Sequence, residues 1–196
     1  MINIIGGKYK GKKLEVPKGN VRPTTSHKRE SIFSKLESIA LKNNYELYNN
    51  KCFIDLFAGT GSLGLESISR GASFAYFFEI NSKVSQILKK NCLNICQKNH
   101  FKIIEQDSSK VHLNKKNIIL PIAAIFIDPP YKTNPIKNIL HKFIKEDILD
   151  NETIIIIESE KNTKFEITEN YNLINQKIYG KTKIAYLQKS RKVLLS

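Results

Sequence analysis

The sequence predicts a doubly wound, Rossmann-like α/β fold, in which a mostly parallel sheet carries helices on both faces. Short apolar runs typical of buried strands alternate with segments whose apolar residues follow helical spacing. A glycine-rich turn joins the first long apolar run to a helix. Two strand-like segments around Gly180 predict a closing antiparallel pair. The expected strands are 51–57, 72–78, 101–104, 122–127, 153–158, 173–179 and 183–188.

Residues 1–25 predict a small basic extension ahead of the sheet domain, which would occupy residues 26–196. Strands at 2–5 and 12–16 would form a hairpin in this extension. With 196 residues, the chain is long enough for one α/β domain with a full core.

Three helices are expected besides the one that follows the glycine turn. They run from about Ser26 to Leu41, where Ser26 can cap the helix, from Asn81 to about Gln97, and from Pro135 to near Leu149. Asn81 is a good N-cap for the second. The residues of the first two helices expected to face the core are Ile32, Phe33, Leu36, Ile39, Ala40, Val84, Ile87, Leu88, Cys92 and Ile95.

The net charge of +14 and the pI near 9.6 favour a polyanionic partner. The basic excess is densest in the first 50 residues, around the expected hairpin. A lysine-rich hairpin can follow the phosphates of a nucleic acid. The basic residues expected to do so are Lys8, Lys10, Lys12, Lys13 and Arg22.

Several classes of protein are disfavoured by composition. No apolar run is long enough to span a membrane, and the N-terminus has no apolar signal core, so we expect a cytoplasmic protein. The three cysteines make a disulfide framework unexpected, and the four histidines show no ligand spacing for a metal. We therefore expect no metal site.

The segment from Asp55 to Gly64 predicts a nucleotide-binding turn. Gly59, Gly61 and Gly64 follow the spacing of turns in which the backbone approaches a ligand at a helix N-terminus. Asp55 stands four residues before the first glycine, where its carboxylate would repel a pyrophosphate and attract a cation. S-adenosylmethionine, which has a sulfonium, an ammonium and no phosphate, fits this turn better than a dinucleotide.

Acidic residues stand at the ends of four consecutive expected strands: Asp55, Glu79, Asp107 and Asp128. Because ligands of open α/β sheets bind outside the carboxyl ends of the strands, these acids should meet at one crevice. Glu79 is placed to hold both ribose hydroxyls, and Asp107 to accept from an adenine amino group. Taken alone, Asp107 is better explained as a solvated turn acid, and only its place in the series of four acids favours the ligand contact.

Asp128-Pro129-Pro130-Tyr131 ends the apolar run 122–127 and predicts a clamp for a planar base with an exocyclic amino group. The carboxylate of Asp128 and the carbonyl of Pro129 would accept the two amino hydrogens, and Tyr131 would stack on the ring. An ordinary proline-rich loop is the alternative interpretation. The cofactor-like turn upstream favours the clamp.

Asp55–Gly61 together with Asp128–Tyr131 resembles the motifs of S-adenosylmethionine-dependent amino-methyltransferases. Further segments are similar to the RsmD family of bacterial 16S ribosomal RNA guanine-N2 methyltransferases: Ile4–Leu14, Val21–Thr25, Arg29–Phe33 and Tyr179–Thr182. The chain departs from the family at Ser26-His27, where the family usually has Asp-Arg, so any contact made by that charged pair is not expected to be preserved.

The resemblance implies a seven-stranded sheet whose last hairpin reverses direction. It also implies S-adenosylmethionine as cofactor and methylation of the N2 of a specific guanine in 16S ribosomal RNA, during assembly of the small ribosomal subunit. We expect a monomer. The residues expected at the cofactor are Asp55, Phe57, Gly59, Thr60, Gly61, Glu79, Asp107 and Asp128, those at the reacting base are Asp128, Pro129 and Tyr131, and those contacting RNA are Lys8, Lys10, Lys12, Lys13, Arg22, Thr24, Arg29, Pro130 and Tyr131.

Three other functions fit parts of the sequence. A DNA adenine-N6 methyltransferase could use the same base clamp, although the chain has no spare block for recognising a DNA sequence. A non-catalytic RNA-binding or ribosome assembly factor would not need the four acids. A dinucleotide-dependent oxidoreductase is disfavoured by Asp55 and by the Pro-Pro-Tyr segment.

Overall fold

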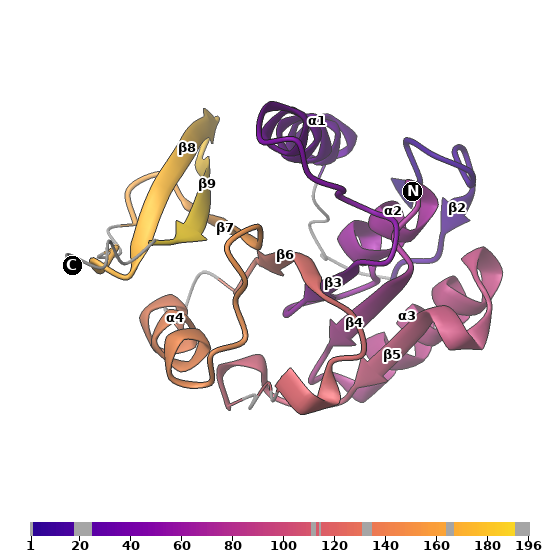
Figure 1. Ribbon diagram of the computed structural model, residues 1–196. Helices are drawn as coiled ribbons and strands as arrows, with labels where there is room; N and C mark the ends of the chain where they lie inside the picture. Colours follow the sequence, from indigo (N-terminus) through magenta and orange to yellow (C-terminus); the bar gives the residue numbers. More distant parts are fainter. Residues whose placement is uncertain are drawn as a thin grey trace.

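Seven strands lie side by side in one sheet, with helices on both of its faces (Figure 1). The computed structural model describes residues 2–17, 25–110, 113, 115–130, 135–163 and 167–190. The strands of the sheet are β3 (Cys52–Asp55), β4 (Phe74–Phe78), β5 (Phe101–Ile104), β6 (Ile122–Ile127), β7 (Ile154–Glu160), β8 (Tyr171–Tyr179) and β9 (Thr182–Lys189). The helices are α1 (Ser26–Lys42), α2 (Ser62–Ser69), α3 (Ser82–Ile95) and α4 (Ile136–Lys145), and short 3-10 turns are η1 (Lys98–His100), η2 (Ser108–Lys110) and η3 (Lys115–Asn117).

The strand order is β5-β4-β3-β6-β7-β9-β8. The first five strands in this order are parallel, while β9 runs antiparallel to both β7 and β8. The predicted α/β class and the terminal antiparallel pair are confirmed. From β3 the chain builds outward to β4 and β5, then crosses back to place β6 on the other side of β3. The strand order therefore reverses between β3 and β6, and ligands bind open α/β sheets at such a point.

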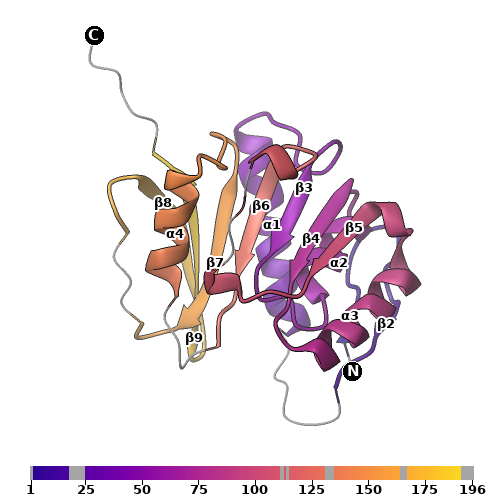
Figure 2. The same cartoon turned by 90° about the horizontal axis from the view of Figure 1, so that it is seen from below.

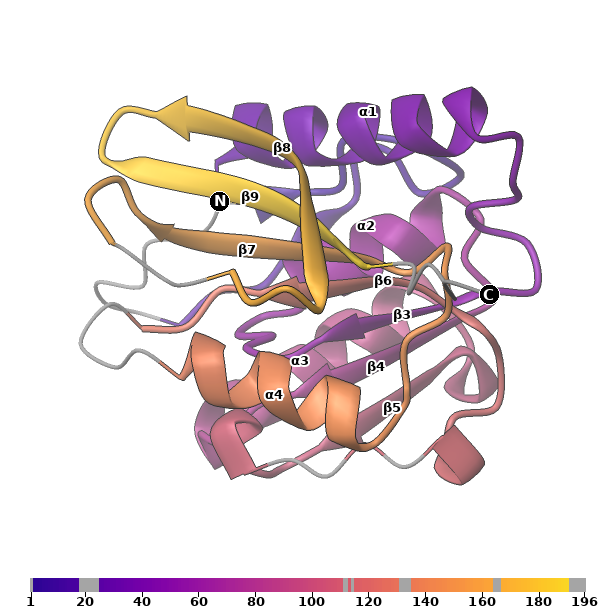
Figure 3. The same ribbon diagram turned by 60° about the vertical axis from the view of Figure 1, so that its left-hand side comes forward.

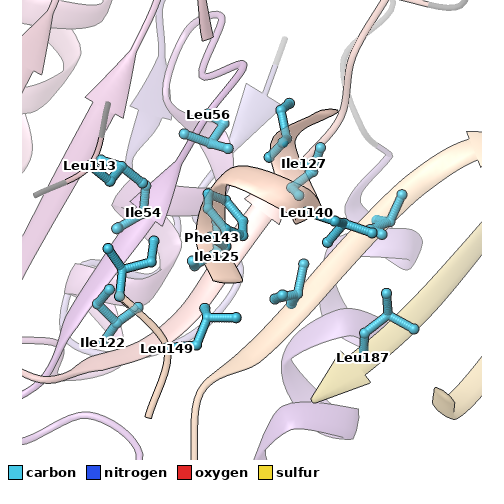
Figure 4. Close-up of a cluster of buried hydrophobic side chains, with 14 of the residues drawn as sticks. Ile54, Leu56, Leu113, Ile122, Ile125, Ile127, Leu140, Phe143, Leu149 and Leu187 are labelled. Atoms are coloured by element: carbon cyan, nitrogen blue, oxygen red, sulfur yellow. The ribbon is translucent and has the colours of Figure 1, made fainter. Parts of the chain in front are cut away.

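The central strands are buried on both faces, as their continuous apolar sequences predict. In β6, Ile125 and Ile127 belong to a cluster that includes α4, and Figure 4 shows both among the side chains of that cluster. Ala124 and Phe126 face the opposite way and pack in a cluster that includes α1. Figure 3 shows α1 and α4 on opposite sides of the sheet.

Helix α1 begins one residue earlier than a cap at Ser26 would require. Thr25 is the N-cap, and its side chain accepts from the backbone N–H of Lys28 at 3.3 Å. The prediction that Ser26 caps the helix is therefore wrong, and Ser26 is the first helical residue. The predicted core face of α1 is confirmed, because its five expected apolar residues are all buried.

The N-terminal hairpin is shorter than predicted. Strands β1 (Ile2–Asn3) and β2 (Lys13–Leu14) pair over two residues each. Beyond Asn3 the chain turns toward α2, and Figure 2 shows β2 beside α3 at one side of the molecule. Residues 18–24 lie outside the described residues, and the division of the chain near residue 25 stays a prediction.

The buried carboxylate of Glu66, on α2, attaches this hairpin to the domain. Glu66 is fully buried and accepts from the backbone N–H groups of Ile5 at 2.9 Å and Gly6 at 2.8 Å. Its Oε1 also pairs with Nε of Arg70 at 3.0 Å. A buried carboxylate is tolerated when cations and N–H donors satisfy it in this way.

We expect Glu66→Ala to lower the free energy of unfolding by about 3–5 kcal/mol, because it leaves buried donors and part of the Arg70 charge without an acceptor. Urea denaturation measures this loss. Glu30→Ala is the matched control, since Glu30 also pairs with Arg70 but its side chain is 53% exposed. The control should cost less than about 1 kcal/mol, and equal costs for the two variants would contradict the assigned role of Glu66.

Candidate active site

The register of the parallel strands brings three of the predicted acids to one edge of the sheet. Asp55 lies opposite Phe77 of β4 and opposite Phe126 of β6. Glu79 and Asp128 each stand two residues beyond those partners. Neighbouring strands are about 4.7–4.9 Å apart. The three carboxylates therefore come from three adjacent strands at one edge of the sheet, with Glu79 and Asp128 two residues beyond the level of Asp55.

The turn between β3 and α2 follows the conformation that its glycines allow. Gly59 and Gly61 have φ values of 54° and 86°, in the left-handed region that favours glycine. A Cβ on Gly59 would meet nothing within 4 Å, so space beside its backbone is open. A Cβ on Gly64 would lie 2.3 Å from the ring of Phe77, so this glycine lets α2 pack closely against β4.

Glu79 is held in place by backbone groups on both sides. Its Oε2 accepts from the N–H of Gly59 at 2.9 Å, and its Oε1 accepts from the N–H of Asn81 at 2.8 Å. The residue is half-buried. A carboxylate oxygen can accept more than one hydrogen bond, so Glu79 can still accept from ligand hydroxyls in this fixed orientation.

Asp55 is almost completely buried. The residue is 3% exposed, and its Oδ2 accepts from the N–H of Gly64, in the first turn of α2, at 3.2 Å. Burial raises the pKa of Asp55 to about 7, opposed by the bond from Gly64 and reinforced by the negative charge of Glu79. The carboxyl therefore changes its charge close to neutral pH.

Asp107 and Ser108 follow β5, the outermost strand on this side of the sheet. Asp107 follows β5 and is half-buried, with Lys110 4.0 Å from its Oδ2. The hydroxyl of the buried Ser108 donates to the carbonyl of Leu56, just beyond β3. That bond ties the segment after β5 to the central strand of the site.

The base clamp is described in part. Asp128 is half-buried, Pro129 is buried and Pro130 is exposed at the end of β6. Tyr131 lies outside the described residues.

The two remaining cofactor candidates are Phe57, which is partly buried against the cluster that includes α4, and Thr60, which is 7% exposed.

The predicted RNA-contacting residues other than Pro130 and Tyr131 of the clamp divide into three groups. Lys8, Lys10, Lys12 and Lys13 are exposed on the hairpin, and the Nζ of Lys12 donates to the carbonyl of Asn94 on α3 at 2.9 Å. Arg22 and Thr24 lie outside the described residues. The four hairpin lysines are open to solvent, and their contact with RNA stays a prediction.

Arg29 forms the third group, and its predicted RNA contact is wrong for this structure. The residue is 1% exposed, and its Nη2 donates to the carbonyl of Asn3 at 2.6 Å. Burial lowers the pKa of its guanidinium, and the negative charge of Glu66 opposes that change. Arg29 thus attaches the hairpin from inside instead of facing a nucleic acid.

Several polar residues near the site were missed by the sequence analysis. The side chain of Asn91, on α3, is fully buried and bonds the carbonyl of Thr60 at 3.0 Å. Lys28 of α1 pairs with Glu158, which follows Ile157 in β7 and so lies beside the end of β6. The one sequence signal for the Asn91 contact was the position of Asn91 on the helix face that also carries the apolar Leu88 and Ile95.

His27, where the chain departs from the RsmD pattern, contacts the other end of the sequence. Its ring lies edge-on to that of Tyr179, with centroids 6.1 Å apart. Tyr179 also shares a hydrogen bond with the hydroxyl of Ser31. The start of α1 therefore packs on the closing hairpin of the sheet.

No group of three or more histidine, cysteine, aspartate or glutamate side chains within the described residues could hold a metal ion. None of the helices described is both long enough and apolar enough to cross a membrane.

A family model described as "Conserved hypothetical protein 95" matches residues 2–188. The chain belongs to this family. Ribosomal RNA small subunit methyltransferase D of Buchnera aphidicola subsp. Acyrthosiphon pisum is 34% identical, over 90% of this chain and 87% of the relative. The protein of the same name from Escherichia coli K12 is 31% identical, over 94% and 87%. The solved structure of yhhF from Escherichia coli matches with a TM-score of 0.80 at 30% identity, over 96% and 98% of the two chains. The RsmD-like family predicted from the motifs is confirmed.

The buried Asp55 gives a prediction about stability and pH. Because its pKa in the folded protein is about 7, against an ordinary value of 3.8, the folded protein holds this proton more tightly than the unfolded chain. Ionisation of Asp55 therefore lowers the free energy of unfolding as pH rises through this interval. Asp55→Asn keeps an acceptor for Gly64 and removes the titration.

We expect the stability of Asp55→Asn relative to the unchanged protein to increase between about pH 4 and pH 8, by up to about 4 kcal/mol. Denaturation curves at several pH values measure this difference. A difference that stays constant over the interval would contradict a carboxyl that keeps its proton in the folded state.

Proposed function

We propose that this protein transfers a methyl group from S-adenosylmethionine to the exocyclic N2 of a guanine in 16S ribosomal RNA, during assembly of the small subunit. The observation that carries the proposal is the meeting of two features at one sheet edge: a glycine turn backed by carboxylates, and Asp128 followed by two prolines. Two relatives named ribosomal RNA small subunit methyltransferase D support ribosomal RNA as the substrate. Guanine 966 is the target expected for this type of enzyme.

The cofactor half of the site fits S-adenosylmethionine. The open space at Gly59 lets a ligand approach the backbone, and Glu79 would accept from the ribose hydroxyls. The carboxyl of Asp55, close to the turn, favours the cationic groups of this cofactor and disfavours a pyrophosphate. Asp107 would accept from the adenine amino group.

Ile80 adds a contact that the motifs do not include. Its side chain follows Glu79 directly and is 68% exposed. An adenine ring beside Glu79 would cover part of this exposed surface. We propose that Ile80 contributes apolar contact to the adenosine.

The clamp half of the site would hold the guanine amino group. The lone pair of that nitrogen is delocalised into the ring, so the free amine is a weak nucleophile. Asp128 and the carbonyl of Pro129 would accept its two hydrogens and turn the lone pair out of conjugation, while Tyr131 stacks on the base. The bound cofactor supplies a methyl group on a sulfonium.

As the new nitrogen–carbon bond forms, the sulfur–carbon bond breaks and the nitrogen loses one proton. Asp128 is the nearest proposed acceptor, either directly or through water. The contribution of the protein is alignment and local electrostatics, and neither a covalent intermediate nor a metal is required.

Lysines on two neighbouring elements support an RNA partner. The hairpin contacts α3 through Lys12 and the carbonyl of Asn94, and through Glu15 and Asn91. Residues 2–17 and α3 together contain seven lysines and one acid, Glu15. Such a surface can follow a phosphate backbone, and its binding would weaken with added salt. With this substrate the protein would act as a monomer in the cytoplasm.

Label transfer distinguishes the proposal from its rivals. The protein is incubated with S-adenosylmethionine carrying a labelled methyl group and with free 16S RNA, small ribosomal subunits or duplex DNA. The proposal predicts label in N2-methylguanosine of the RNA or of the subunits. Label found only in DNA adenine would establish the adenine-N6 alternative, and RNA binding without transfer would favour an assembly factor.

We expect Asp128→Ala to lower the methylation rate by about 100-fold or more, because the amino group loses a charged acceptor. Calorimetry with S-adenosylhomocysteine should give an affinity within about threefold of the original, less than one hydrogen bond to a charged group would contribute. Asp128→Asn is the matched variant. It keeps one acceptor oxygen, so its methylation rate should lie between those of Asp128→Ala and the unchanged protein. Near-normal turnover in Asp128→Ala would exclude the assigned role.

Glu79→Ala should weaken the binding of S-adenosylhomocysteine by about 10- to 100-fold, because hydrogen bonds from the ribose to a charged acceptor are lost. Glu105→Ala is the control, since Glu105 lies nearby after β5 and bonds Ser85 instead. Unchanged calorimetric affinity in Glu79→Ala would contradict the ribose assignment.

A further inference from the structure

Asn91 lies between the N-terminal hairpin and the cofactor turn and bonds both. It stands on α3 with 0% exposure. Its Oδ1 accepts from the N–H of Glu15 at 2.8 Å, and its Nδ2 donates to the carbonyls of Glu15 and Thr60, each at 3.0 Å. One side chain thus joins two segments that are 45 residues apart in sequence.

The orientation of this amide is fixed by its partners. An asparagine amide has two donor hydrogens and one acceptor oxygen. Reversing it would place the oxygen of Asn91 against two carbonyls and its nitrogen against an N–H group, which would lose all three hydrogen bonds. A shift of either partner segment must therefore break a buried hydrogen bond or move Asn91 with it, and leaving such a bond unmade is costly.

On the cofactor side, Asn91 fixes the central peptide of the turn. Thr60 stands between Gly59 and Gly61, and the N–H of Gly61 donates back to the carbonyl of Ala58 at 2.8 Å. The other end of the same turn is held by Glu79, through the N–H of Gly59. The turn is therefore attached at one end to the proposed ribose-binding acid and at its centre to Asn91.

On the hairpin side, Asn91 holds both backbone groups of Glu15, directly after β2. Other anchors of the hairpin lie elsewhere: Arg29 of α1 bonds Asn3, Lys12 bonds the carbonyl of Asn94 on α3, and two more residues lie on α2. Ser69 accepts from the N–H of Tyr9 at 2.9 Å and donates to the carbonyl of Gly6 at 2.6 Å, and Glu66 holds the chain nearby. Within the described part of the chain, the side chains of Ser69 and Glu66 make no hydrogen bond to the turn.

We propose that Asn91 is a positioning residue that couples cofactor binding at the turn to RNA binding at the hairpin. A ligand that orders the Thr60 peptide would also order Asn91 and Glu15, so the second ligand would meet a segment that is already fixed, and its binding would be tighter. The coupling rests on the proposed function, because it needs both a cofactor and an RNA. Asn91 itself touches neither.

The coupling is measured as the ratio of two dissociation constants for unmethylated 16S ribosomal RNA, one without and one with saturating S-adenosylhomocysteine. The unchanged protein should bind RNA about fivefold or more tightly with the cofactor product. In Asn91→Ser, which is too short to reach both segments, the ratio should fall to within about twofold. A ratio that is the same in the two proteins would overturn the proposal, even if both affinities fall.

Ser69→Ala is the matched control, because it removes a hairpin anchor without any link to the turn. It should weaken RNA binding by the same factor with and without S-adenosylhomocysteine, so the ratio of the unchanged protein is kept. If Ser69→Ala lowered the ratio as much as Asn91→Ser does, general loosening of the hairpin would explain the effect and Asn91 would have no special role.

Hydrogen exchange on the unchanged protein tests the link without a substitution that could disturb folding. Adding S-adenosylhomocysteine should slow exchange of the Glu15 amide, which donates to Asn91, more than exchange of the Tyr9 amide, which donates to Ser69. Equal effects on the two amides would contradict the proposal. Failure of the proposed function looks different: the unchanged protein would then transfer no label to ribosomal RNA, whatever the ratio.

Discussion

The parallel register of β3 with β4 and β6 is the constraint on which the proposed site depends. It places Asp55 level with Phe77 and Phe126, so that Glu79 and Asp128 emerge from the neighbouring strands just beyond it. A slip of one residue would turn every side chain of a strand to the other face of the sheet. Because both faces of β3 and β6 are packed with apolar side chains, that slip is strongly opposed. The apolar core thus fixes the position of the polar site.

The attachment of the hairpin depends on a different kind of contact. Glu66, Arg29 and Asn91 are buried polar residues, and each bonds the backbone of the N-terminal segment. Buried polar groups contribute when all their partners are in place and are costly otherwise, so such contacts specify one docked position. A basic hairpin held in this way presents its lysines at a fixed place relative to the sheet edge.

Much of the fold was predictable because it is encoded locally. The glycine spacing, the apolar strand runs and the Asn81 cap each depend on residues close together in sequence, and the structure has the turn, the strands and the cap. The order of the strands was expected from the family resemblance alone, since pairing between distant segments leaves no local pattern. The meeting of the acids at one edge was expected from their positions at the ends of parallel strands, and the register places three of them on adjacent strands.

Contacts between distant residues account for what the sequence did not reveal. On α3 the apolar pattern predicted a core face through Val84 and Ile87, yet these are half-buried, and the polar Ser85 and Asn91 are buried instead. Their partners, Glu105 and Glu15, lie 20 and 76 residues away. Arg29 was assigned to RNA for the same reason: its charge is visible in the sequence, whereas its burial beneath the hairpin is a property of the assembled fold.

The most direct test of the account is a structure of the protein with S-adenosylhomocysteine bound. We predict the ribose hydroxyls on Glu79, the adenine toward Asp107 and the sulfur facing the end of β6, where Asp128 would present the guanine. A ligand bound away from the β3 turn, or one whose sulfur faces away from Asp128, would contradict the claim that cofactor and base meet at this edge.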